Sequence, residues 1–266
     1  MLNGSFGLNG EYKMILRKFT KHIVDQNWFA VGLDVIVVVV GIFLGMMMTE
    51  WNEKRQLRGT EGQYLLSLRA DLETSITLAD SRLDDLYKIS DACYRLIQQS
   101  KLEVPTITSD EMDHLVYQCL YAMGILGQHR TTLDEMKSSG KFSIIDDIEL
   151  RKALQNIDVF YQEVKLMEMD IYDFLKSGVE PFLIKNYDSL QFQQHSKNII
   201  HSPNQQKQYP VEPLEDFTPL LKSREFKNYV NWRYSFTANA TSEVSDLKTE
   251  YQTILILIDK RIAALN

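Results

Sequence analysis

The hydrophobic pattern of the chain separates one apolar run near its beginning from a long amphipathic remainder. Residues 28–49 are 22 consecutive positions with a single charge, Asp34. At ~1.5 Å per residue, an α-helix of this length crosses the ~30 Å hydrocarbon core of a bilayer. The sequence that follows, MMMTEWNEKR, lacks the small-residue site of a cleaved signal peptide. We therefore expect an uncleaved membrane-spanning helix, in preference to the buried helix of a soluble protein.

One face of this expected helix carries an unusual combination of residues. Positions 34, 38, 41, 45 and 48 repeat every three or four residues, which brings Asp34, Gly41 and Gly45 together. Two glycines four apart form a GxxxG motif, which lets helix backbones approach closely. A carboxylate at the bilayer centre costs ~2.5–3.5 kcal/mol, a cost that a neighbouring helix reduces. We interpret this face as a helix–helix interface. The alternative is that the glycines are ordinary membrane-helix residues and that Asp34 reaches the headgroups.

The flanks of the run indicate how it is placed in a lipid bilayer. Trp28 and Trp51 stand near its two ends, where amphipathic rings prefer the headgroup level. Four basic residues precede the run and three follow it closely, so the positive-inside rule narrowly favours a cytoplasmic N-terminus. We expect a short basic cytoplasmic tail at 1–27, with net charge +2, and a transmembrane helix at 28–49. The remaining 50–266, with net charge −8, form an extracytoplasmic body.

The body repeats apolar residues at helical intervals, and no segment has the alternation of a strand. One stripe runs from Tyr64 to Leu96 and ends before Pro105, and the last runs from about Lys222 to Leu265. The polar, proline-rich residues at about 186–219 are typical of a long surface loop. We predict an all-α fold in which one transmembrane helix runs into an antiparallel helical bundle.

Local signals predict where these helices begin and end. Capping boxes at Thr108/Glu111 and Thr132/Glu135, and an N-cap at Asp147, predict three helix starts. The helix after Thr108 is expected to continue to about Gly127. Two further glycines, Gly140 and Gly178, are expected to end helices, and Gly59 and Gly62 are the expected hinge after the span.

The two cysteines fit the same antiparallel arrangement. Cys93 lies nine residues before Leu102, and Cys119 lies nine residues after Asp110. If Leu102 and Asp110 bound the turn, both thiols lie at equal height on facing helices. The spacing then permits a disulfide, which would require an oxidising compartment. The alternative is two small apolar core residues, the usual role of free cysteine.

The chain lacks recognisable catalytic chemistry. Its five histidines show no metal-ligand spacing with cysteines or carboxylates, and no phosphate-binding loop, dinucleotide fingerprint or nucleophile elbow is present. We therefore predict no catalytic residues, no metal, no cofactor and no enzyme activity. The net charge of −7 also argues against a nucleic-acid partner.

The spacing of Asp34, Gly41 and Trp51-Asn52-Glu53, an acidic-x6-Gly-x9-Trp-Asn-Glu pattern, resembles an uncharacterised family of bacterial single-span membrane proteins. LRADLETSI at 68–76 and TTLDEMKSSGKFSIIDDIELRKAL at 131–154 are also similar to that family. This chain departs from it at Asp34, where the family more often has Glu, and at Leu33, where it has a small residue. The resemblance implies a bacterial inner (cytoplasmic) membrane, and it supplies no activity. With the orientation that the basic residues favour, the body would then lie in the periplasm.

Two functions of different class fit these features. The first is a non-enzymatic, membrane-anchored interaction or sensory module, whose span associates with copies of itself or with a membrane-protein partner. The second is the small subunit of a proton-driven motor or transport-energising complex, with Asp34 as proton carrier, since burial raises the pKa of a carboxyl group. The body lacks the mixed α/β pattern of such subunits, which favours the first.

Overall fold

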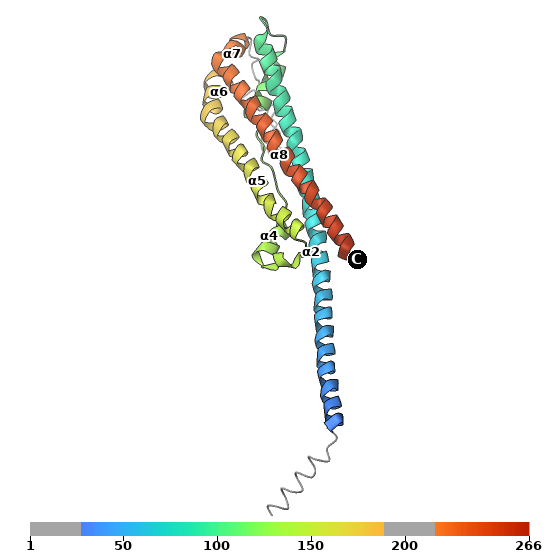
Figure 1. Cartoon of the computed structure of the whole chain (residues 1–266). Helices are drawn as coiled ribbons and strands as arrows, with labels where there is room; N and C mark the ends of the chain where they lie inside the picture. Colours follow the sequence, from blue (N-terminus) through green and yellow to red (C-terminus); the bar gives the residue numbers. More distant parts are fainter. Residues whose placement is uncertain (1–27, 189–215, 266) are drawn as a thin grey trace, which may run out of the picture. The chain divides into compact units, whose positions relative to one another are not determined.

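A computed structural model describes residues 28–188 and 216–265, with side chains from residue 32 onward. Every regular element in these ranges is a helix, which confirms the predicted all-α fold (Figure 1). The elements include two π-helices, η1 and η3, and one 3-10 helix, η2. In chain order they are α2 (Trp28–Lys101), α3 (Ser109–Val116), η1 (Tyr117–Tyr121), α4 (Thr131–Ser138), η2 (Lys141–Ile144), α5 (Ile148–Phe174), η3 (Leu175–Val179), α6 (Glu180–Asn186), α7 (Thr218–Lys222) and α8 (Arg224–Leu265). The predicted tail at 1–27 lies outside the described residues.

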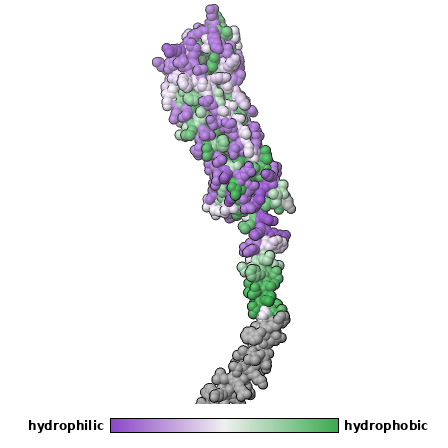
Figure 2. Space-filling view, viewed as in Figure 1, coloured by the Kyte–Doolittle hydropathy of each residue, from purple (hydrophilic) through white to green (hydrophobic). Residues whose placement is uncertain are grey.

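The chain divides into two compact units, Met1–Gly59 and Thr60–Asn266. In the first, the described part is the beginning of α2, and every side chain from 32 to 59 is exposed. This part is long and apolar enough to cross a membrane, and its surface is apolar where the span was predicted (Figure 2). α2 continues without a break through Gly59 and Gly62, the expected hinge, and the boundary between the units falls directly after Gly59.

In the second unit, α2 and α8 run antiparallel. Arg69 Nε on α2 lies 3.1 Å from Asp259 Oδ1 on α8. Further along α2, the ring of Tyr94 lies 6.5 Å from that of Tyr234, so the partner number falls as the α2 number rises. Their facing stripes are buried, and the core is completed by α5. Side chains with 0 % exposure include Leu65, Leu86, Leu96, Leu154, Leu247 and Ile258. The Tyr64–Leu96 stripe and the last stripe therefore pack as predicted.

The chain that returns beside α2 is helical in its first half only. α3 and η1 pack on the end of α2, where Cys93 meets Cys119. From Ala122 the backbone is extended, with ψ 128°, and it stays irregular until α4. The prediction of a helix to about Gly127 is wrong, because side chains of other helices bind the polar groups that a continuing helix would bond internally.

Local caps were predicted with mixed success. The side chains of Thr108 and Asp147 accept hydrogen bonds from the backbone N–H groups three residues on, as expected of N-caps. The predicted capping box at Thr132 is wrong: α4 begins at Thr131, and the Thr132 N–H donates to Asp71 Oδ2 of α2, 2.8 Å away. The cap is tertiary, so no local pattern could show it.

The two glycines expected to end helices behave differently. Gly140 follows α4 with φ 71°, a left-handed conformation that favours glycine. Gly178 does not end a helix, because the chain stays helical through η3 and α6 to Asn186. An added Cβ at Gly178 would lie 3.1 Å from Tyr229 Cε1 on α8, so this glycine permits close helix packing.

The predicted loop at about 186–219 falls largely outside the described residues. α6 ends at Asn186, and the next helix among the described residues is α7, which begins at Thr218. The predicted start of the last helix at Lys222 is early by two residues, since Ser223, with ψ 129°, separates α7 from α8.

Candidate functional site

The predicted interface residues of the span share one exposed helical face. Asp34, Gly41 and Gly45 all lie on α2, whose helical backbone places them along one side. No atom lies within 4 Å of an added Cβ at Gly41 or Gly45, so neither glycine is explained by packing within the described chain. The Thr49 hydroxyl donates to the Gly45 carbonyl at 3.0 Å, which satisfies a polar group inside the apolar segment.

The ends of the span were predicted to carry tryptophan anchors. Trp51 is 64 % exposed, and the Arg55 guanidinium lies 5.9 Å from its ring centroid, over the indole. Paired with a basic side chain, the ring suits the boundary between hydrocarbon and headgroups. Trp28 begins α2, but its side chain lies outside the described ones.

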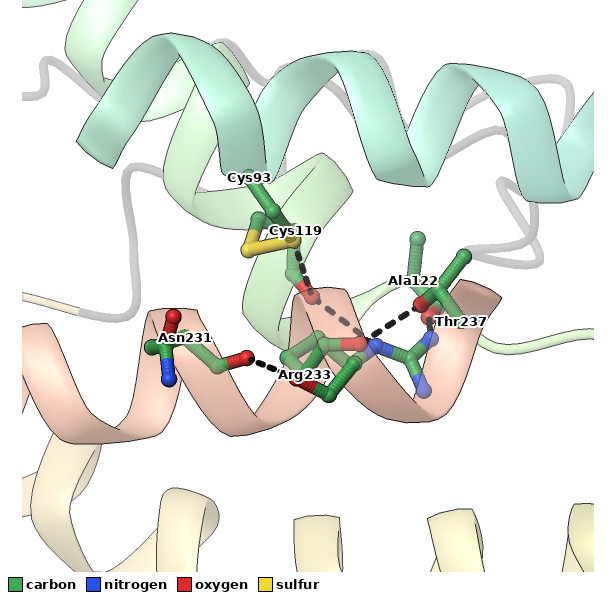
Figure 3. Close-up of a disulfide and its surroundings, with 7 residues drawn as sticks. Cys93, Cys119, Ala122, Asn231, Arg233 and Thr237 are labelled. Carbon is green, nitrogen blue, oxygen red and sulfur yellow. Dashed lines mark hydrogen bonds between the residues drawn. A yellow bond between two sulfur atoms is a disulfide. The ribbon is translucent and has the colours of Figure 1, made fainter. Parts of the chain in front are cut away.

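Cys93 and Cys119 form a disulfide between α2 and η1, in the arrangement that their spacing permits (Figure 3). Their Cα atoms are 5.0 Å apart, and both residues have 0 % exposure. The bond therefore ties the end of the long helix to the returning chain from within the core.

Arg233 of α8 binds the end of the same π-helix. Its Nε donates to the Cys119 carbonyl at 3.1 Å, and its Nη2 donates to the Ala122 carbonyl at 2.9 Å (Figure 3). These contacts replace the bonds that those carbonyls would receive in a continuing helix. Arg233 is 1 % exposed, so a charged group stands in the core where α3–η1 ends.

Two further buried charges surround the extended segment at 122–126. Glu168 of α5 accepts a hydrogen bond from the Leu126 N–H at 2.7 Å. Arg82 of α2 places its Nε 3.5 Å from Glu168 Oε1, and its Nη1 would lie 2.7 Å from a Cβ added at Gly124. Arg82 is 5 % exposed and the Glu168 side chain 9 %. We call Arg82, Glu168 and Arg233 the buried charge cluster.

The buried charge cluster holds two cations and one anion. Burial, and after it the charge of Arg82, lowers the pKa of Arg233 to about 10. Burial also lowers the pKa of Arg82, against the attraction of Glu168 and then of Asp85. Among the described residues, Arg82 Nη1, Arg233 Nη1 and Glu168 Oε2 have no hydrogen-bond partner. The cluster thus holds one carboxylate for two guanidinium groups, and Asp85, exposed on α2, is the next group whose charge acts on Arg82.

The apolar stripes contained the signal for this cluster. Arg82, Glu168 and Arg233 each follow a buried stripe residue at a spacing of three or four: Ala79, Val164 and Val230. A charged residue at such a position must find partners in the core or from outside. None of the three residues was predicted from the sequence, because which charges meet depends on how the helices are paired.

A second buried ion pair lies at the other end of the second unit. Glu61, 2 % exposed, accepts two hydrogen bonds of 2.8 Å from the Arg261 guanidinium of α8. It also accepts one of 3.1 Å from the Asp146 N–H, before α5. The hydrogen bonds and charge of Glu61 raise the pKa of Arg261. Both carboxylate oxygens of Glu61 therefore accept hydrogen bonds, whereas Glu168 Oε2 of the buried charge cluster accepts none among the described residues.

An open cavity of about 710 Å³ lies beside the buried charge cluster, between α2 and the returning chain. Arg82 and Gly124 line it, together with Asp85, Asp91 and Tyr117. Within the described residues, no group of three or more His, Cys, Asp or Glu side chains is arranged to hold a metal ion. Comparison of the chain with protein-family models, with curated proteins and with solved structures finds no match.

Proposed function

We propose that this protein is a non-enzymatic, single-span membrane module whose span associates with other helices and whose helical bundle meets a partner or stimulus outside the cytoplasm. The main support for this proposal comes from the first part of α2, where the apolar side chains from Leu33 to Met48 are 45–70 % exposed. Such a continuous apolar surface is unfavourable in water and must be covered by lipid or by other helices.

The face of Asp34, Gly41 and Gly45 is the proposed contact between helices. Both glycines leave open space above the backbone, and so allow a second helix to approach closely. Asp34 is exposed on that face, where a neighbouring helix shields its carboxylate from lipid. A second copy of the span is the simplest partner, since it presents the same face.

The proposed location is a bacterial inner membrane, with the N-terminus cytoplasmic and the bundle periplasmic. The resemblance around Trp51-Asn52-Glu53 and the narrow excess of basic residues before the span support it. The disulfide in the core of the bundle supports the extracytoplasmic side, because disulfides persist in oxidising compartments.

The first test is purification of the full chain in mild detergent, followed by native mass determination. We expect a homo-oligomer. A multi-span partner in fixed ratio would instead favour the small subunit of a proton-driven motor, with Asp34 as proton carrier. A lone monomer would contradict the proposed interface.

Substitutions of glycine on two faces make the test specific. Gly41→Leu combined with Gly45→Leu should abolish the oligomer, because two bulky side chains prevent close approach. Gly32→Leu is the matched control: nine residues before Gly41, it lies half a turn away on the opposite face and is equally open. It should leave the oligomer unchanged. Equal loss in both variants would mean that any added bulk disturbs the span.

A further inference from the structure

The open cavity beside the buried charge cluster contains charges of both signs. Arg82 enters it from the core, 5 % exposed, with Nη1 lacking a hydrogen-bond partner among the described residues. Asp85 and Asp91, both exposed, also line the cavity. Asp85 is one turn of α2 beyond Arg82, whereas Asp91 is nine residues beyond it and therefore about half a turn round the helix. The Arg82 guanidinium and the Asp85 carboxylate thus line the same space from neighbouring turns of one helix.

The guanidinium of Arg82 is incompletely compensated. Its neighbour Glu168 is shared: Oε1 lies 3.5 Å from Arg82 Nε and accepts a better hydrogen bond, of 2.7 Å, from the Leu126 N–H. The second guanidinium nearby, that of Arg233, is engaged with carbonyl groups, which carry no charge to offset it. A bound anion would add to the compensation that Glu168 and the exposed Asp85 give Arg82. A carboxylate accepts the paired N–H groups of a guanidinium well.

A multiply charged anion fits the cavity poorly. Asp85 and Asp91 would repel a phosphate dianion. The other two basic side chains of the lining, Lys88 and Arg95, are already in exposed ion pairs, Lys88 with Asp85 at 3.5 Å and Arg95 with Glu111. A molecule that carries one carboxylate and one ammonium group meets both kinds of wall residue with an opposite charge.

The remaining walls favour a ligand with some apolar surface. Tyr87, Tyr117, Leu115 and Met123 contribute apolar surface to the lining, beside the polar side chains of His114 and Gln118. The volume of about 710 Å³ lies within the range of roughly 300–1,000 Å³ that is typical of small-molecule sites. Gly124 has no side chain, so the Arg82 guanidinium can lie against its backbone. A Cβ at this position would lie only 2.7 Å from Arg82 Nη1.

We propose that this cavity binds a small zwitterion of the amino-acid class, with its carboxylate on Arg82 and its ammonium group toward Asp85. The site lies wholly in the second unit and involves no residue of the span. It extends the proposed function by giving the bundle a chemical stimulus, and it can fail while self-association stands.

The test is isothermal titration calorimetry of the full chain in mild detergent. The probes are the twenty L-amino acids one at a time, with sodium acetate, ethylammonium chloride and inorganic phosphate as single-charge or multiply charged comparisons. We expect at least one amino acid to bind more than tenfold tighter than acetate, ethylammonium or phosphate. If none does, or if phosphate binds tightest, the zwitterion proposal is wrong.

Variants of α2 assign the binding to the cavity. Arg82→Met and Asp85→Asn should each weaken binding of the best amino acid at least tenfold. Asp84→Asn is the matched control for Asp85→Asn, because Asp84 is exposed on α2 but does not line the cavity. Unchanged affinity in both Asp85→Asn and Arg82→Met, or an equal loss in Asp84→Asn, would overturn the proposal. Asp85→Asn changes an exposed residue, so the test survives a folding failure of Arg82→Met.

Failure of this proposal is distinguishable from failure of the proposed function. The span variant with Gly41→Leu and Gly45→Leu should bind the amino acid as the unchanged chain does, because its substitutions are all in the first unit. If native mass shows the oligomer but no amino acid binds, the zwitterion proposal is wrong and the proposed self-associating membrane module still stands.

Discussion

The helix α2 carries two opposite patterns in one continuous element. Before Gly59 its side chains are all exposed, and most of those from Leu33 to Met48 are apolar. From Glu61 onward an apolar stripe is buried, and polar side chains cover the outside. The second unit also buries charged side chains, those of Glu61, Arg82 and Arg233. The first unit therefore exposes apolar residues, and the second buries some charged ones. The same helical geometry thus serves two environments, and what surrounds each part decides which side chains can be apolar or charged.

The largest expected effect compares the two parts of α2 through the same change, Leu to Ala, made once in each. Leu86→Ala removes a side chain with 0 % exposure and should lower the free energy of unfolding by about 2–5 kcal/mol. Leu44→Ala removes one that is 57 % exposed and should change it by less than about 0.5 kcal/mol. Denaturant unfolding of the full chain in detergent, followed by circular dichroism, measures both. Similar losses would show that the Leu44 side chain is packed within the folded protein.

The second effect concerns the disulfide. Replacing both Cys93 and Cys119 by Ala opens a loop of sequence separation 26, and should lower the free energy of unfolding by about 3 kcal/mol. Reduction of the unchanged chain with dithiothreitol should lower its stability by a similar amount and leave the Ala variant unaffected. The oligomer should persist in both, because the bond lies in the second unit. Dissociation of the oligomer on reduction would show that association of the span depends on the disulfide in the second unit.

The third effect tests the pairing at the start of the second unit. Glu61→Gln keeps the shape of the side chain but removes its charge, leaving Arg261 with a neutral partner, and should cost about 2 kcal/mol. A double-mutant cycle with Arg261→Met isolates the pair. A coupling energy below about 0.5 kcal/mol would mean that the ion pair adds nothing beyond packing.

The smallest effect concerns pH. Burial disfavours the charge on Asp158, but the hydrogen bond from Lys137, at 2.6 Å, and the charge of Arg130 outweigh it and lower the pKa of Asp158. The contribution is therefore full above the ordinary carboxyl pKa near 4 and is lost as pH falls through the lower folded value. Asp158→Asn should cost less than about 1 kcal/mol at pH 7, since the side chain is 43 % exposed. The difference from the unchanged chain should shrink as the pH falls below the ordinary carboxyl pKa, measured by thermal unfolding across pH. A constant difference at all pH values would contradict the ionic origin.

Much of the architecture followed from patterns along the chain. The uncharged run at 35–49 and the stripe from Tyr64 to Leu96 fixed the two parts of α2, because helical periodicity is a local property. Thr108 and Asp147 marked helix starts, because each caps N–H groups only three residues away. The equal spacing of the two cysteines from their turn placed them opposite each other.

What only the tertiary structure decided involves partners far apart in sequence. Asp71 caps the N–H of Thr132, 61 residues later, and Arg233 binds the Cys119 carbonyl, 114 residues earlier. These contacts moved a helix start and ended a helix that its own pattern would have continued. The charged residues of the buried charge cluster were visible in the stripes, but a sequence does not show which charges will share a core. That depends on helix pairing, which sets the distance between them and therefore the sign and size of their interaction.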